Sequence, residues 1–330
     1  MGCVKVSNKK SFGLFYKKGS AGFKGVPLFS AHVNVWNISE SDNPFIDLGL
    51  LIENYKCVES ICFMVPFEVD VEDIEDLSYV LKEDEIQLIF NNSKYAYQQY
   101  QQMEAAFNTG FINDKQEKAL IFPIKDEDGN VLQNVEYIKN SGKIQIKIDI
   151  KKFGIIPDSI NSIYIRFRIK NVDAQKILSN LPVKNNYLES AFVKRQILDF
   201  KLNNVRTIKR HDLNQLSNEN YSLIQFKAIH LFVMVPSDYE ISVWGDFSEC
   251  RQLEKNEWNN YLKNSVSKPK EEIFAYHWKQ KAENEKTVDE FAQLIKMEHK
   301  STNLIMIAIY CLIVIILGAL GSGLAELITH

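Results

Sequence analysis

One stretch near the C-terminus constrains the fold of this 330-residue chain more than any other: residues 304–325 contain no charged side chain. As an α-helix that rises 1.5 Å per residue, the stretch would be about 33 Å long, which matches the roughly 30 Å hydrocarbon core of a bilayer. A buried core helix this uniformly apolar would need protein on every side, yet only five residues follow it. We therefore predict a transmembrane helix over 304–325 and a short non-cytoplasmic tail over 326–330.

The residues that flank this stretch predict its orientation. Lys296 and Lys300 precede it, whereas no Lys or Arg follows it, so the positive-inside rule leaves the large N-terminal part in the cytoplasm. The start of the chain has no uninterrupted apolar core of the kind that a signal peptide needs. The five cysteines form no CxxC pair and agree with reduced cytosolic thiols. These features predict a single-pass, tail-anchored membrane protein that has the lipid bilayer as a partner.

The net charge of −3 hides a strong asymmetry along the chain. Between Lys143 and Arg210 there are ten Lys and five Arg against four Asp and one Glu, whereas nine carboxylates lie between Glu68 and Glu85. The acidic residues accompany apolar residues at helical spacing from Val71 to Leu81, which predicts a short amphipathic helix over 71–82. Such segregated charge can attract an anionic partner or hold two parts of one chain together.

Short runs of alternating or continuous apolar residues dominate the first 245 residues or so and predict strands. The fold class that they predict is mainly β, with one or two β-sandwiches and short helices. Polar residues at 211–220 predict a loop. The predicted strands are 29–37, 45–52, 60–65, 119–124, 131–138, 143–150, 163–170, 197–205, 223–235 and 239–244.

Two of these strands carry isoleucines on one face and cations on the other. If 143–150 and 163–170 are neighbours in one sheet, their outer faces form a basic patch that could bind an anionic ligand. An ordinary charged sheet surface that resists aggregation is the simpler alternative, and an internal role in holding the acidic segment 71–82 is a third. The predicted binding residues are Lys143, Lys147, Tyr164, Arg166, Arg168 and Lys170.

The last part of the chain before the apolar stretch is highly charged and predicts a stalk. Residues 264–270 are polar and include Pro269, which predicts a linker. Further on, Val288, Phe291 and Ile295 recur at intervals of three and four residues, which predicts a helix. We therefore expect a β-rich head over 1–263, with a subdivision near residue 140, and a linker with a helical stalk over 264–303.

Within the predicted span, small residues recur at intervals of four, as Gly318 with Ser322 and Ala319 with Gly323. Such pairs let two helices approach closely, although small residues are also common in membrane helices for other reasons. We therefore predict self-association through this segment.

No local motif for catalysis, metal binding or phosphate binding is present, so the sequence predicts a protein without cofactor, metal or enzymatic activity. The architecture suggests a membrane-acting effector of defence or stress, whose cytosolic head binds an anionic ligand or a protein partner and whose spans oligomerise. The first alternative is a static tether with the sandwich as an interaction domain, and the second is a membrane-anchored enzyme whose catalytic residues are dispersed in the sequence.

Overall fold

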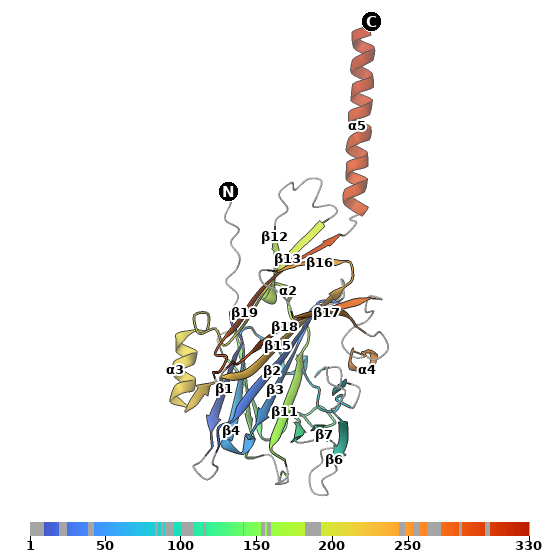
Figure 1. The fold of residues 1–330 in the computed structure, drawn as a ribbon. Coiled ribbons are helices and arrows are strands. Elements are labelled where there is room, and N and C mark those ends of the chain that lie inside the picture. The colour runs from blue at the N-terminus through green and yellow to red at the C-terminus, as the bar shows by residue number, and fades with distance from the viewer. Residues whose placement is uncertain are drawn as a thin grey trace.

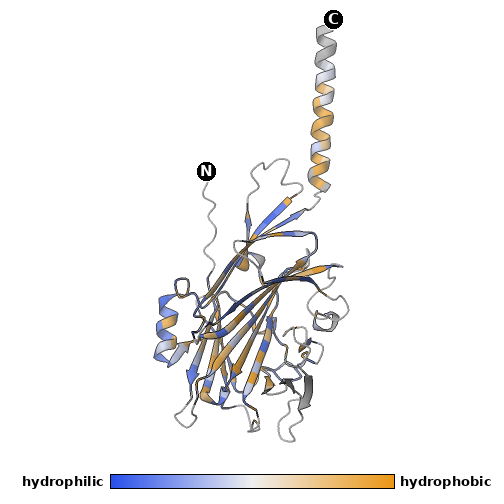
Figure 2. Ribbon diagram, viewed as in Figure 1, coloured by the Kyte–Doolittle hydropathy of each residue, from blue (hydrophilic) through white to orange (hydrophobic). Residues whose placement is uncertain are grey.

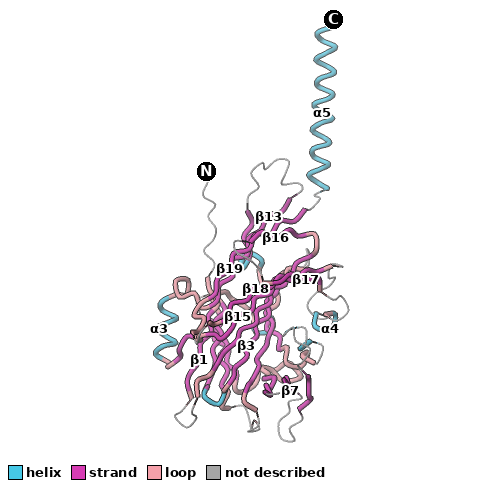
Figure 3. Tube along the Cα trace, in the orientation of Figure 1, coloured by secondary structure: helices cyan, strands magenta, loops and turns pink. Residues whose placement is uncertain are grey.

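The protein is mainly β, with three sheets and few helices (Figure 3). The computed structural model describes residues 10–19, 25–38, 43–82, 85–86, 89, 96–100, 109–114, 117–140, 142–152, 156, 160–181, 193–243, 248–253, 258–262, 272–283, 286–300 and 304–329. The predicted linker at 264–270 lies outside these residues.

Two sheets form the body of the molecule (Figure 1). The smaller has the order β14 (Tyr221–Leu223), β1 (Gly13–Lys18), β4 (Val58–Val65), β10 (Ile144–Asp149) and β9 (Val135–Lys139). The ten-stranded sheet has the order β17 (Glu249–Gln252), β18 (Ile273–Lys281), β15 (Phe226–Pro236), β2 (Leu28–Trp36), β3 (Phe45–Glu53), β11 (Ser162–Ile169), β8 (Glu117–Phe122), β7 (Thr109–Asp114) and β6 (Ala96–Tyr100), and β5 (Ile74–Asp76) also pairs with β11.

The core lies between these two sheets in a sandwich-like arrangement. The isoleucines of β10 and those of β11 belong to one buried apolar cluster, although the two strands lie in different sheets. The rings of Phe63 on β4 and Phe167 on β11 meet edge to face, with centroids 5.0 Å apart. Alternation therefore directs one face of each strand into a common core, as expected for strands that each have one buried face.

A third sheet extends the body and shares its core. Its order is β12 (Leu178–Leu181), β13 (Val193–Leu202), β19 (Phe291–Lys300) and β16 (Tyr239–Val243). It joins β1 through Asn203, whose side-chain oxygen accepts from Leu14 N at 2.7 Å and whose amide donates to Ile224 O at 2.8 Å. Asn203 has a positive φ of 55°, a conformation that asparagine tolerates better than most residues.

Short helices cover the outer faces of the two large sheets. Helix α3 (Arg210–Asn218) packs on the five-stranded sheet through Leu216, which contacts Phe15, Cys62 and Met64. Helix α4 (Asn259–Leu262) lies on the ten-stranded sheet, where Trp258 and Tyr261 join a second buried cluster. The predicted loop at 211–220 is therefore mostly helix, because a core on the sheet surface stabilises it. The shortest elements are η1 (Tyr55–Cys57), η2 (Val71–Asp73) and α2 (Ala174–Ile177).

Two predicted helical segments are strands or turns instead. The predicted stalk contains β18 and β19, which pair with β15 and β13 inside the sheets, so no separate helical stalk is present in the described part of 264–303. Phe291 and Ile295 are four residues apart, a spacing that fits both a helix and one face of a strand. The predicted helix at 71–82 is η2 followed by β5 and a turn, because β5 pairs with β11 through backbone hydrogen bonds.

Helix α5 (Leu304–Thr329) projects away from the sheets and is mostly apolar (Figures 1 and 2). Among the residues that the structure describes, no helix is both long enough and apolar enough to cross a membrane. This finding contradicts the predicted transmembrane helix at 304–325, and with it the predicted single-pass membrane localisation and the predicted tail at 326–330.

Candidate functional site

The six predicted binding residues do not form one surface. Lys143 and Lys147 belong to the five-stranded sheet, whereas Tyr164, Arg166 and Arg168 are on β11 of the ten-stranded sheet. The two strands face each other across the core, so their outer faces point in opposite directions. The combined basic patch that neighbouring strands would have produced is therefore not formed.

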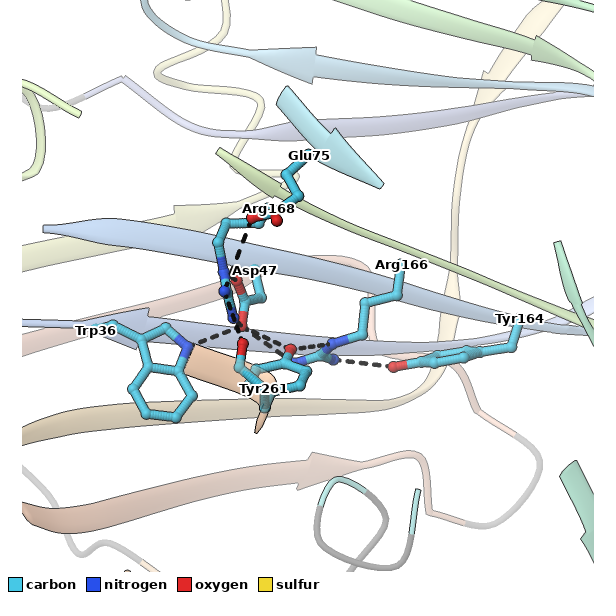
Figure 4. A network of polar contacts seen from close by, with 7 residues as sticks. All are labelled: Trp36, Asp47, Glu75, Tyr164, Arg166, Arg168 and Tyr261. Carbon is cyan, nitrogen blue, oxygen red and sulfur yellow. Dashed lines mark hydrogen bonds and ion pairs between the residues drawn. The ribbon is translucent and has the colours of Figure 1, made fainter. Parts of the chain in front are cut away.

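Arg166 and Arg168 are fully buried on the outer side of their sheet, under α4 (Figure 4). Asp47 on β3 accepts from Arg168 Nε at 2.7 Å and from the Tyr261 hydroxyl at 2.7 Å. Trp36 Nε1 donates to the same carboxylate at 2.8 Å. These contacts give the buried charges the partners that they need in a low-dielectric interior.

Tyr261 connects the two arginines to the segment that covers them. Its hydroxyl accepts from Arg166 Nε at 2.7 Å, and its backbone oxygen accepts from Arg168 Nη1 at 3.0 Å. The Tyr164 hydroxyl accepts from Arg166 Nη1 at 2.9 Å. A Cβ atom added at Gly49 would lie 2.4 Å from that hydroxyl, so glycine makes room for the network. Tyr164, Arg166 and Arg168 therefore fix the covering segment onto the sheet.

This network was not predicted by the sequence analysis, although one signal could have indicated it: Asp47 and Gly49 are the two interruptions in an otherwise apolar stretch at 45–52. An ionisable residue inside a central strand needs a buried partner of opposite charge. Burial alone would raise the pKa of Asp47, but Arg168 and Arg166 hold the pKa below its usual value. The partner could not be named from sequence, because Arg168 is 121 residues away.

Lys143 and Lys147 hold α3 and the turn after it against the five-stranded sheet. Lys143 Nζ donates to Asp212, and both side chains are almost fully buried. Lys147 Nζ lies 2.5 Å from a carboxylate oxygen of Glu219. Both predicted ligand-binding lysines thus pair with carboxylates of the chain itself.

Lys170, the last predicted binding residue, lies at the rim of a cleft of about 810 Å³. Its ammonium is 3.1 Å from Glu75 on β5, and Arg168 Nη1 is 3.9 Å from the same carboxylate. The Asn171 amide donates to Asp73 at 2.6 Å. The end of β11 therefore binds the acidic residues at 73–75. This contact is the internal role that the sequence analysis left open for these cations.

Asp76 holds the walls of this cleft together through hydrogen bonds, although the sequence analysis did not identify this residue. Its carboxylate accepts from the backbone N–H groups of Ile124 at 2.6 Å, Lys125 at 2.9 Å and Ser78 at 2.8 Å. Burial raises the pKa of Asp76, while these hydrogen bonds favour its ionised form. Asp76 thereby ties the turn at 125–131 to β5.

Lys125 and Tyr79 complete the cleft. Lys125 Nζ donates to Val71 O at 3.0 Å, and burial lowers the pKa of this lysine. The Tyr79 hydroxyl donates to Lys125 O at 3.1 Å, and burial raises the tyrosine's pKa. Perturbed ionisable groups that gather in one cleft mark a candidate functional site.

The chemistry that the cleft offers is recognition of positive charge. Carboxylates of Glu72, Glu75, Asp126 and Glu127 line it beside the apolar residues Val71, Ile74 and Val131, against the two cations Lys125 and Lys170. Elsewhere too, the described residues contain no group of three or more His, Cys, Asp or Glu side chains placed to hold a metal ion.

The four small residues predicted to mediate self-association all lie on α5. A Cβ atom added at Gly318 or Gly323 would meet no atom within 4 Å, and Ala319 and Ser322 are exposed. Packing within one chain therefore does not require these residues to be small. Association between chains through them stays a prediction.

Comparisons with known proteins give no family. No family model matches the sequence, and no curated protein matches it. Among solved structures, the chain is similar to the M1 zinc metallopeptidase from Deinococcus radiodurans, with 10% identity over 87% of this chain and a TM-score of 0.25. The match spans only 43% of the length of that enzyme. A similarity this low carries no argument about the fold or activity of the present chain.

Proposed function

We propose that the protein is a binding module rather than an enzyme, and that the cleft between β5 and the turn at 125–131 binds a basic segment of a partner protein. This proposal keeps the partner-binding head that the sequence suggests and changes the sign of the charge that it recognises. We call the site the acidic cleft.

The proposal depends on one observation. Carboxylates and apolar side chains line the same cleft, and hydrogen bonds to Asp76 hold its two walls together. Lysine and arginine side chains have an apolar stem and a charged end, so they match such a surface. The apolar part of the cleft would cover the stem, while Glu72 and Glu127 would face the charged group. Within the described part of the chain, neither of these two carboxylates forms an ion pair.

An anionic ligand is the weaker candidate at the residues first predicted to bind it. Arg166, Arg168, Lys143, Lys147 and Lys170 all lie within 4 Å of a carboxylate of the chain. An incoming anion would have to displace those carboxylates, and a buried charge that loses its partner is costly.

The test is binding of a fluorescein-labelled hexalysine peptide to the full chain, followed by fluorescence anisotropy. We expect the double variant Glu72→Gln and Glu127→Gln to weaken binding about tenfold, which corresponds to about 1.4 kcal/mol. Added salt should weaken binding to the parent chain, because the contacts are partly exposed to solvent.

A matched control distinguishes an effect at the cleft from an effect of overall net charge. The variant Glu249→Gln with Glu283→Gln removes the same net charge near β18, and β15, β2 and β3 lie between β18 and β11. It should bind hexalysine as the parent does. Equal weakening in both double variants would reject the acidic cleft, and preference for a hexaglutamate peptide would favour the anionic alternative.

A further inference from the structure

A second cleft lies on the outer face of the five-stranded sheet. It has a volume of about 780 Å³, within the range of small-molecule sites. Its floor comes from the adjacent strands β1, β4 and β10, and its rim comes from the start of β9 and the turn after α3. Strands form a rigid floor, so the positions of its polar groups are set before any ligand arrives.

The charged groups of this cleft are paired with one another. Lys17 lies 2.6 Å from Glu59, and Lys147 lies 2.5 Å from Glu219. These pairs raise the pKa of Lys17 and lower the pKa values of both glutamates. A charged ligand would therefore have to compete with an existing partner at each of these four ions.

Neutral hydrogen-bonding groups lie between these pairs. The hydroxyls of Ser60 and Tyr221 are 2.9 Å apart, and burial raises the pKa of Tyr221 to about 12, so its proton is retained at neutral pH. The Asn134 amide donates to Asp149 O at 3.2 Å and leaves its own side-chain oxygen beside the cleft. The exposed carboxylate of Glu136 stands at the rim.

We propose that this cleft binds a neutral, polyhydroxylated ligand, that is, a saccharide. A sugar hydroxyl both donates and accepts, so it can bond to an ammonium and a carboxylate of an ion pair without separating them. Each carboxylate oxygen has a second lone pair and each ammonium has further N–H groups for this purpose. Hydroxyl, amide and carboxylate groups on one rigid floor therefore suit a polyol better than an ion. This site is independent of the acidic cleft.

The experiment is isothermal titration of the full chain with glucose, galactose, mannose, N-acetylglucosamine, maltose and cellobiose, each up to about 50 mM. We expect at least one of them to bind with millimolar affinity that does not change with salt, because no net charge is neutralised. The variant Tyr221→Phe with Glu136→Gln removes one hydroxyl and one carboxylate while it keeps the ring and the side-chain shape. It should weaken binding at least fivefold.

The control variant Tyr79→Phe with Glu127→Gln makes the same two changes in the acidic cleft and should bind sugar as the parent does. Circular dichroism on both variants establishes that each is folded. The proposal fails if no sugar in the panel binds to the folded parent chain, or if both variants bind equally well. Salt-sensitive binding of inorganic phosphate in place of sugar would also overturn it and would assign an anion site.

Discussion

At the scale of single residues, the charge of Asp47 is at the centre of a buried network on the ten-stranded sheet. It is fully buried and is contacted by Arg168, Tyr261 and Trp36, while Arg166 Nη2 lies 3.6 Å away. Asp47→Asn would leave the guanidinium groups of Arg166 and Arg168 buried without the buried carboxylate that now pairs with them. We expect a loss of about 3–5 kcal/mol in the free energy of unfolding, measured by urea denaturation.

The control for this prediction is Glu53→Gln, which removes a surface ion pair with Lys227 at 2.8 Å. Exposed pairs contribute about 1 kcal/mol or less, so this variant should remain close to the parent. The pH dependence has a defined sign. Because the pKa of Asp47 is lowered in the folded state, its contribution is present above the unfolded value of about 4 and is lost as pH falls through the folded value. Similar losses for both variants would contradict the buried role of Asp47.

At the scale of elements, three strands of the ten-stranded sheet place histidines in a row on its outer face. The ring of His32 on β2 stacks on His230 of β15 at 5.0 Å, and His230 stacks on His277 of β18 at 5.2 Å. The ring nitrogens of His230 and His277 are 3.1 Å apart. Burial and the neighbouring imidazoles disfavour a positive charge on these rings, so the pKa values of all three are lowered.

This row predicts that acid destabilises the sheet. Burial lowers the pKa of His230 to about 3 and that of His277 to about 4, and the nearby charges are mainly cations: Arg166, Lys279, Lys281 and Arg251, with Glu249 opposite His277. The stability from the neutral rings is therefore present above pH 6.5 or so and is lost as pH falls from there toward 4. Urea denaturation between pH 7 and 4 should show a steeper loss for the parent than for His230→Gln.

An exposed histidine provides the control for the pH experiment. His211 on α3 has an exposed side chain. The variant His211→Gln leaves the histidine row intact, so it should keep the pH dependence of the parent. An unchanged slope in His230→Gln would mean that the row does not control acid stability.

At the scale of the whole molecule, α5 exposes a continuous apolar surface that one chain does not cover. Ile305 is 74% exposed and Ile315 is 70% exposed. Burial of apolar area is favourable by about 25 cal/mol per Å², so association of copies through this helix would be stabilising. We expect Gly318→Leu with Gly323→Leu to weaken the association, because the added side chains would hold the two helix backbones apart, so that neighbouring apolar side chains would bury less area against the partner.

Cysteine cross-linking measures this association directly. Cys311 lies seven residues before Gly318, on nearly the same face of α5, and is exposed. In a Cys3→Ser and Cys250→Ser background, mild oxidant should give a disulfide-linked dimer of the parent and much less dimer of the leucine variant. Equal dimer yields would show that Gly318 and Gly323 are not at the contact. Replacing Leu317 with Phe provides a control that enlarges α5 on a face that points away from both glycines.

The sequence determined much of the local structure, because the alternation of side chains along a strand is a property of neighbouring residues. Ile144 to Asp149 and Ser162 to Ile169 are strands whose isoleucines are buried, as predicted. The β class follows from many such runs. Asp47 and Gly49 interrupt an apolar strand, and a buried polar network could have been predicted from this interruption.

The tertiary structure decided which strands are neighbours, because pairing depends on backbone groups that are far apart in the chain. Alternation would be satisfied equally whether β10 and β11 lay side by side or across a core, and they lie across it. The tertiary structure also decided which polar faces of the strands are exposed to water. Arg166 and Arg168 look solvent-facing by alternation, yet α4, about 95 residues later, covers them and supplies Tyr261. A second layer over a sheet converts its outer face into an interior, and no periodicity within the strand can signal that.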